Sequence, residues 1–141
     1  MSLSDMLSAL NGGISSRKSE IEEKISRLKT AKREVKKEQD AAETDLKQIK
    51  KPKLGSSWKG DLSENFKSAR NEAHDELKKI VNDEYPSYVS SIEFKITTLE
   101  LELSALSVAS SLAGDAARLA EKGEDALEDA KRLISKAWSS F

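Results

Sequence analysis

Apolar residues recur at every seventh position along much of this 141-residue chain, and this period restricts the possible folds more than any other feature. A heptad repeat places such residues on one narrow stripe of a helix, with charged residues on the remaining faces. It predicts one helix from about Ser4 to Lys50, bent or frayed at Gly12 and Gly13, each of which costs about 1 kcal/mol relative to alanine. The stripe is formed by Leu7, Ile14, Ile21, Leu28, Val35, Ala42 and Ile49.

A second and clearer heptad run occupies the middle of the chain. Its members are Ile92, Leu99 and Leu106, interleaved with Val89, Ile96 and Leu103. The preceding apolar residues are expected on the same side of the same helix, namely Leu62, Phe66, Ala69, Ala73, Leu77, Ile80 and Val81. Pro86 lies inside the run and lacks a backbone donor, so the helix is expected to kink there, or to end and restart.

The segment between the two runs predicts a reversal of chain direction. Pro52 ends the first helix, and a linker extends to about Gly60. Asp61 with Glu64 provides a cap for the second helix; a cap at Ser57 is the alternative. The two helices have nearly equal lengths, so we predict an all-α fold, an antiparallel coiled-coil-like hairpin with Trp58 and Gly60 at its bend.

The charges are distributed unevenly between the two predicted arms of the hairpin. Residues 17–53 carry thirteen Lys or Arg against eight Asp or Glu, whereas residues 61–141 carry ten against sixteen. An antiparallel pairing brings these unlike halves together, which gives a modest attraction that salt weakens.

The last third of the chain predicts one additional helix. Small residues follow one another at the heptad spacing there, which allows close helix packing. We expect a helix from about Asp115 to Ser139 that folds back on the hairpin, and an uninterrupted continuation of the second helix is the alternative. Trp138 is expected to pack this helix. The domain prediction is therefore a hairpin over residues 1–110 and a helical extension over residues 111–141.

Composition argues against several classes of function. The chain has no cysteine, a net charge of −1 and no apolar run near the ~20 residues that span a bilayer. His74 is the single histidine and has no catalytic neighbours, and the acidic residues near Glu121 lack a metal-binding spacing. The basic stretch Lys29–Lys37 contains no aromatic residue. We predict no enzyme activity, no cofactor or metal, no nucleic acid and no membrane span.

One motif supports a resemblance to a known family. Trp58-Lys59-Gly60 lies between two long helices and is followed by Phe66. This layout resembles the WXG family of helical hairpins, which are associated with type VII (ESX) secretion. It is most similar to YwqH-like proteins that accompany LXG toxins, with an extra C-terminal segment. The Tyr-x-x-x-Asp/Glu export signal of WXG substrates is missing, because Val89 follows Tyr85 and Ile92 follows Tyr88 at that spacing.

The resemblance implies an adaptor that binds the helical N-terminal domain of an LXG toxin or a second WXG-like protein. Two narrow stripes bury little core, which also favours a partner helix. The predicted partner-binding residues are Trp58, Gly60, Phe66, Ile92, Ile96, Leu99, Leu103 and Leu106. The alternative is a structural coiled coil that self-associates as a homodimer, without a role in secretion. The N-terminus lacks the pattern of a signal peptide, so we predict a cytoplasmic location, with export through a partner left open.

Overall fold

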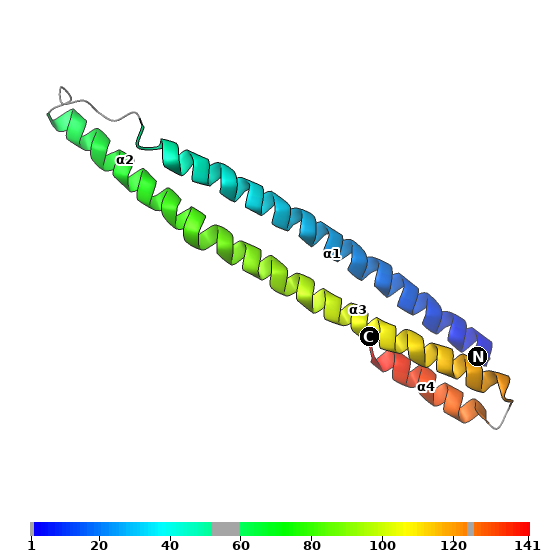
Figure 1. Cartoon of the computed structure of the whole chain (residues 1–141). Coiled ribbons are helices and arrows are strands. Elements are labelled where there is room, and N and C mark those ends of the chain that lie inside the picture. Colours follow the sequence, from blue (N-terminus) through cyan, green and yellow to red (C-terminus); the bar gives the residue numbers. More distant parts are fainter. Residues whose placement is uncertain (1, 52–59, 124–125) are drawn as a thin grey trace. The chain divides into compact units, whose positions relative to one another are not determined.

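The structure, a computed structural model, describes residues 2–51, 60–123 and 126–141. These residues form helices and short turns, with no strand among them, which confirms the predicted all-α class (Figure 1). The helical elements are α1 (Leu3–Gln48), α2 (Asp61–Lys79), the π-helical turn η1 (Ile80–Glu84), α3 (Tyr85–Glu121) and α4 (Leu127–Ser139).

The chain divides into two compact units, each with its own packing. The first, called here the three-helix unit, comprises Met1–Leu28 and Lys95–Phe141 and contains the first half of α1, most of α3, and α4. The second, called here the two-helix unit, comprises Lys29–Phe94. In the two-helix unit the α1 segment runs antiparallel to its partner helices. Lys32 Nζ lies 2.8 Å from Glu93 Oε1, whereas Gln39, further along α1, contacts the earlier residue Val81 at 3.1 Å.

Five of the eight buried residues in the core cluster of the three-helix unit are alanines, which let three helices approach closely. Leu10, Ile14 and Ile134 are the large side chains among the eight, and fully burying one such side chain contributes about 1.5–3 kcal/mol. Larger, partly buried hydrophobic residues pack around this cluster. The alanines come from α3 (Ala109, Ala113, Ala116) and α4 (Ala130, Ala137). The close packing expected for the small residues of the last third is therefore present.

The predicted start of the last helix near Asp115 is wrong. α3 continues through Gly114 and Asp115 to Glu121, because Ala113 and Ala116 are held in the core on both sides of that point. The chain turns instead near Gly123, whose φ of 103° favours glycine. A separate last helix does follow, and it ends at Ser139 as predicted.

α1 continues as a helix through Gly12 and Gly13, so it does not fray there, and Gly13 has a packing role. A Cβ on Gly13 would lie 2.9 Å from Cη2 of Trp138 at the end of α4, whereas a Cβ on Gly12 would meet no atom within 4 Å. Trp138 in turn stacks on Phe141 with ring centroids 5.3 Å apart. Trp138 is thus a packing residue, as expected, and Gly13 provides the space for its indole.

This difference between the two glycines gives a prediction with a built-in control. Gly12→Ala should raise the free energy of unfolding by about 1 kcal/mol, because alanine favours the helix and meets no neighbour. Gly13→Ala should lose that gain, because the added methyl displaces the indole of Trp138. Urea unfolding measures both, and equal stabilisation by the two variants would contradict a packing role for Gly13.

In the two-helix unit, Pro86 is accommodated by a π-helical turn rather than by a helix end. Tyr85 donates its backbone N–H to the carbonyl of Ile80, five residues earlier. The same pattern would pair residue 86 with Val81, but proline has no N–H to donate. The side-chain amide of Gln39 on α1 donates to the Val81 carbonyl instead, at 3.1 Å. The backbone thus remains helical from Asp61 to Glu121.

The predicted apolar line of α2 is only partly buried. Val81 is buried and Leu77 and Ile80 are half-buried, but Leu62 and Phe66 are exposed, as are Ala69 and Ala73. The residues that face inward along α2 are Ser63, Lys67, Arg70, His74 and Leu77. The prediction is therefore wrong for the first part of α2, where the partly buried face is formed by largely polar residues.

Candidate helix-binding surface

Several of the predicted partner-binding residues lie inside the chain's own core. Leu99 and Leu106 are each 2% exposed and Ile96 is buried, while Ile92 and Leu103 are half-buried. A partner contacts only exposed atoms, so in this conformation these side chains serve the packing of the chain itself. Their part in partner binding stays a prediction.

The residues predicted around the bend are only partly visible. Trp58 lies outside the described residues. Gly60 occupies the N-cap position of α2 with φ 95°, and its carbonyl accepts from the N–H of Glu64 at 3.1 Å. The predicted side-chain cap by Asp61 is therefore wrong, and Asp61 and Glu64 instead lie in the first turn, where the helix dipole favours negative charge. Phe66 is exposed, with the Arg70 guanidinium 5.3 Å from its ring centroid.

The surface that sequence reasoning missed lies on the opposite side of α3. Leu101 is 67% exposed and Val108 is 55% exposed, and their spacing of seven positions places both on one face. Ser104 lies between them on that face and carries no charge. We call Leu101, Ser104 and Val108 the outer stripe. Phe94, seven residues before Leu101 on the same helix, is also exposed.

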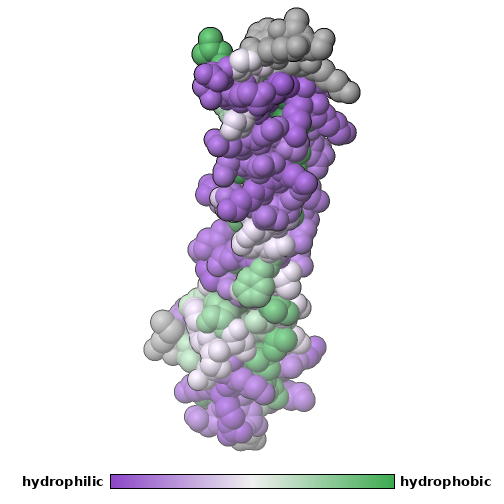
Figure 2. All heavy atoms as spheres, turned by 90° about the vertical axis from the view of Figure 1, so that its left-hand side faces the viewer, coloured by the Kyte–Doolittle hydropathy of each residue, from purple (hydrophilic) through white to green (hydrophobic). Residues whose placement is uncertain are grey.

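The outer stripe belongs to a chain in which 35% of the residues are charged and only 37% are hydrophobic. Figure 2 shows hydrophobic side chains gathered over one part of the visible face, with hydrophilic residues over most of the rest. A helix that is apolar on two sides is ordinarily covered on both. The signal was present in the sequence, because Phe94, Leu101 and Val108 form a heptad line of their own.

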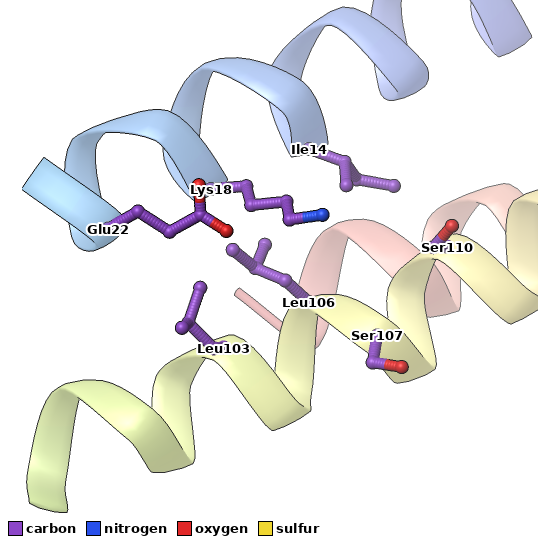
Figure 3. A pocket seen from close by; sticks show the side chains of 7 residues that line it. All are labelled: Ile14, Lys18, Glu22, Leu103, Leu106, Ser107 and Ser110. Carbon is purple, nitrogen blue, oxygen red and sulfur yellow. The ribbon is translucent and has the colours of Figure 1, made fainter.

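Next to the outer stripe, α1 and α3 enclose a pocket in the three-helix unit, which we call the open groove (Figure 3). Its volume is about 220 Å³, and no residue of α4 lines it. Ile14, Leu103 and Leu106 form its apolar part, and the Lys18 side chain extends over it from α1. The remaining lining residues are Glu22, Ser107 and Ser110.

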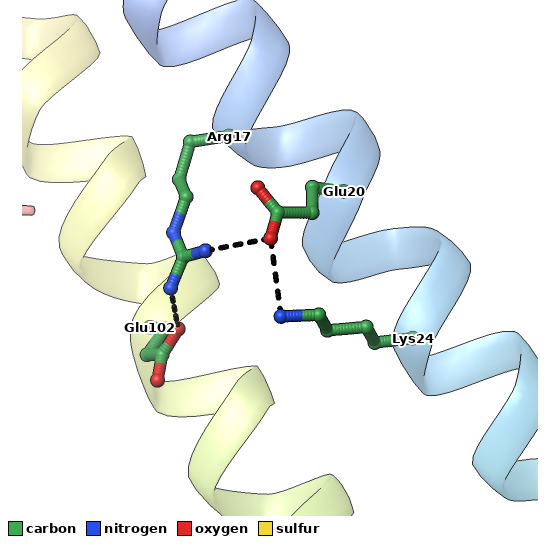
Figure 4. Close-up of polar contacts among 4 residues, drawn as sticks. All are labelled: Arg17, Glu20, Lys24 and Glu102. Atoms are coloured by element: carbon green, nitrogen blue, oxygen red, sulfur yellow. Dashed lines mark hydrogen bonds and ion pairs between the residues drawn. The ribbon is translucent and has the colours of Figure 1, made fainter.

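A polar network links α1 and α3 near the C-terminal end of α4 (Figure 4). Arg17 lies 2.9 Å from a carboxylate oxygen of Glu102 and 3.2 Å from one of Glu20, which Lys24 also approaches at 3.1 Å. The hydrogen bond and charge of Lys24, followed by Arg17, lower the pKa of Glu20 below its usual value. Both carboxylates on this side therefore have a basic partner.

Neither a metal-binding cluster nor a membrane-spanning helix occurs in the part of the chain that the structure describes. In residues 2–51, 60–123 and 126–141, no three His, Asp or Glu side chains come together in a way that could hold a metal ion. Across the same ranges, no helix has the length and apolar character that crossing a membrane requires. What this part of the molecule does provide is exposed apolar surface on a helix.

Comparison with known proteins places the chain in a family. A family model described as YwqH-like matches residues 6–118. The chain belongs to the YwqH-like family. Protein YwqH of Bacillus subtilis (strain 168) is 41% identical to it over 134 residues, which cover 95% of this chain and 93% of that protein. No solved structure matches the chain. The outer stripe and the open groove both fall within the region that the YwqH-like model matches, whereas α4 lies beyond it.

Proposed function

We propose that this YwqH-like chain is a non-enzymatic helical adaptor that binds the helical N-terminal domain of an LXG-type toxin and accompanies it to type VII secretion. The observation that carries the proposal is the outer stripe, an exposed apolar line on a helix already buried on its other side. A partner helix recognises such a line through apolar residues at matching spacing.

The exposed position of the outer stripe suggests that its residues serve to bind a partner rather than to stabilise the fold of this chain. Leu101 and Val108 contribute little to the core, yet they expose apolar atoms to water at a cost that a partner helix removes. The WXG-like layout around Trp58 and Gly60 suggests which partner to test first. In this proposal the adaptor and toxin meet in the cytoplasm, and the toxin supplies the export signal that Tyr85 and Tyr88 do not.

Co-expression with an LXG-type toxin tests the proposal. The tagged chain should co-purify with the toxin's helical N-terminal domain, and Leu101→Lys should weaken the complex about 30-fold or more, because it places an unpaired charge in an apolar contact. Titration calorimetry gives the Kd of each variant.

Leu62→Lys is the matched control, because Leu62 is a similarly exposed leucine on α2. It should leave the Kd unchanged. Absence of a complex at micromolar concentrations, or equal weakening by both variants, would count against the adaptor role. A chain that dimerises by itself and ignores the toxin domain would favour the structural coiled coil.

A further inference from the structure

Buried side chains are distributed unevenly between the two units of the chain. Among the described residues of the two-helix unit, only Ser63 and Val81 are buried, and the other buried residues all belong to the three-helix unit. A region with few buried apolar contacts opens locally at a lower free energy than the core of the same protein. The two-helix unit is therefore expected to be the less stable of the two.

Within the two-helix unit, the part that lies before Val81 on α2 has the least apolar packing. On α1, the half-buried residues beyond Gln39 include Ala42 and Leu46. On α2, most of the side chains that are at least partly buried are polar, so they gain little when they leave water. They are Ser63, Lys67, Arg70 and His74, followed by Leu77.

A buried hydrogen bond lies where this weakly packed part ends. The side-chain amide of Gln39 donates to the carbonyl of Val81 at 3.1 Å, and Val81 is itself a buried apolar residue. We call this contact the clasp. An opening that extends past Val81 loses both the hydrogen bond and the apolar burial, whereas an opening of the residues before it loses neither.

We infer that residues 40–48 of α1 and residues 61–79 of α2 open as one local unit while the rest of the chain stays folded, and that the clasp sets the limit of this opening. Most of the stability of a helix in a protein comes from its packing, so α2 unfolds when it separates from α1. The opening exposes Leu46 and Leu77, which are half-buried in the closed form. The inference does not depend on the proposed function.

Hydrogen exchange of the full chain, followed by mass spectrometry, tests the local opening. After correction for intrinsic rates, the amides of residues 61–79 should exchange about 100-fold faster or more than those of residues 109–116, which contain the buried alanines of α3. Equal protection of the two segments would show that the chain opens only as a whole, and would overturn the inference.

The clasp is tested by its effect on a different segment. Gln39→Leu should speed the exchange of residues 85–92 about tenfold, because the opening then extends past Val81, and should leave residues 109–116 unchanged. Gln48→Leu is the matched control, since Gln48 is exposed on α1, and it should not affect residues 85–92. Unchanged exchange of residues 85–92 in Gln39→Leu, or equal acceleration of every segment, would overturn the clasp as the limit of the opening.

A third pair of variants tests the cause of the weak packing. His74→Leu should slow the exchange of residues 61–79 about tenfold, because it puts an apolar side chain of similar size on the partly buried face of α2. Asn71→Leu places the same side chain on the exposed face and should slow the exchange far less. An equal effect of the two variants would show that the polar character of this face is not the cause of the opening.

Discussion

Leu10→Ala should lower the free energy of unfolding by about 2–5 kcal/mol, the range found when a buried leucine is truncated and leaves a cavity. Leu10 is fully buried in the three-helix unit, among the alanines of α3 and α4. Alanines cannot extend to fill the space, so the cavity should stay open. The loss is a large part of the 5–15 kcal/mol that stabilises a typical domain.

The same substitution at Leu101 is the control, because Leu101 lies on the exposed side of α3. Leu101→Ala should change the free energy of unfolding by no more than about 0.5 kcal/mol. Urea unfolding followed by circular dichroism gives both values from midpoint and slope. Comparable losses at the two positions would mean that the outer stripe belongs to the core, and would remove the basis of the adaptor proposal.

Gln39→Leu should destabilise the chain by about 1–3 kcal/mol, which is the cost of leaving a buried carbonyl without a donor. The carbonyl is that of Val81, a residue that is 1% exposed, so water does not replace the lost amide. Leucine has nearly the size of glutamine, which keeps the packing change small. Gln48→Leu on the exposed surface of α1 should have little effect.

A double-mutant cycle with Pro86→Ala identifies the cause of this loss. Alanine at position 86 restores an N–H that can reach the Val81 carbonyl through the π-helical pattern. The cost of Gln39→Leu should therefore fall by more than half in the Pro86→Ala background. An unchanged cost would show that Gln39 acts through packing and does not replace the donor that Pro86 lacks.

The sequence predicted the fold well wherever the apolar residues at heptad spacing are also the residues that become buried. The heptad of α1 and that of α3 around Leu99 and Leu106 predicted the two long helices and their pairing, and the small residues of the last third predicted the C-terminal helix. Which face of α2 is buried was not predictable in this way. The spacing of apolar residues within α2 gives no sign of the π turn that follows it in the same helix. The end of α3 was misplaced because weak helix breakers such as Gly114 are tolerated when tertiary contacts hold the residues around them.

The candidate site was harder to predict than the fold. The strongest apolar residues of α3 were assigned to the partner, although the chain's own helices cover them. Leu101 and Val108 form a weaker line that becomes informative only once the covered side of α3 is known. The role of Gly13 depended likewise on a contact with Trp138, 125 positions further along the sequence.

The π turn has a consequence for comparing related sequences. It accommodates one residue more than a regular α-helix would hold between α2 and α3. A homologue with a single deletion within Ile80–Glu84 would form a regular helix and still present the same faces on either side of the gap. Alignments across this point therefore need a one-residue gap to match equivalent positions of α2, and a gap there implies no change of architecture.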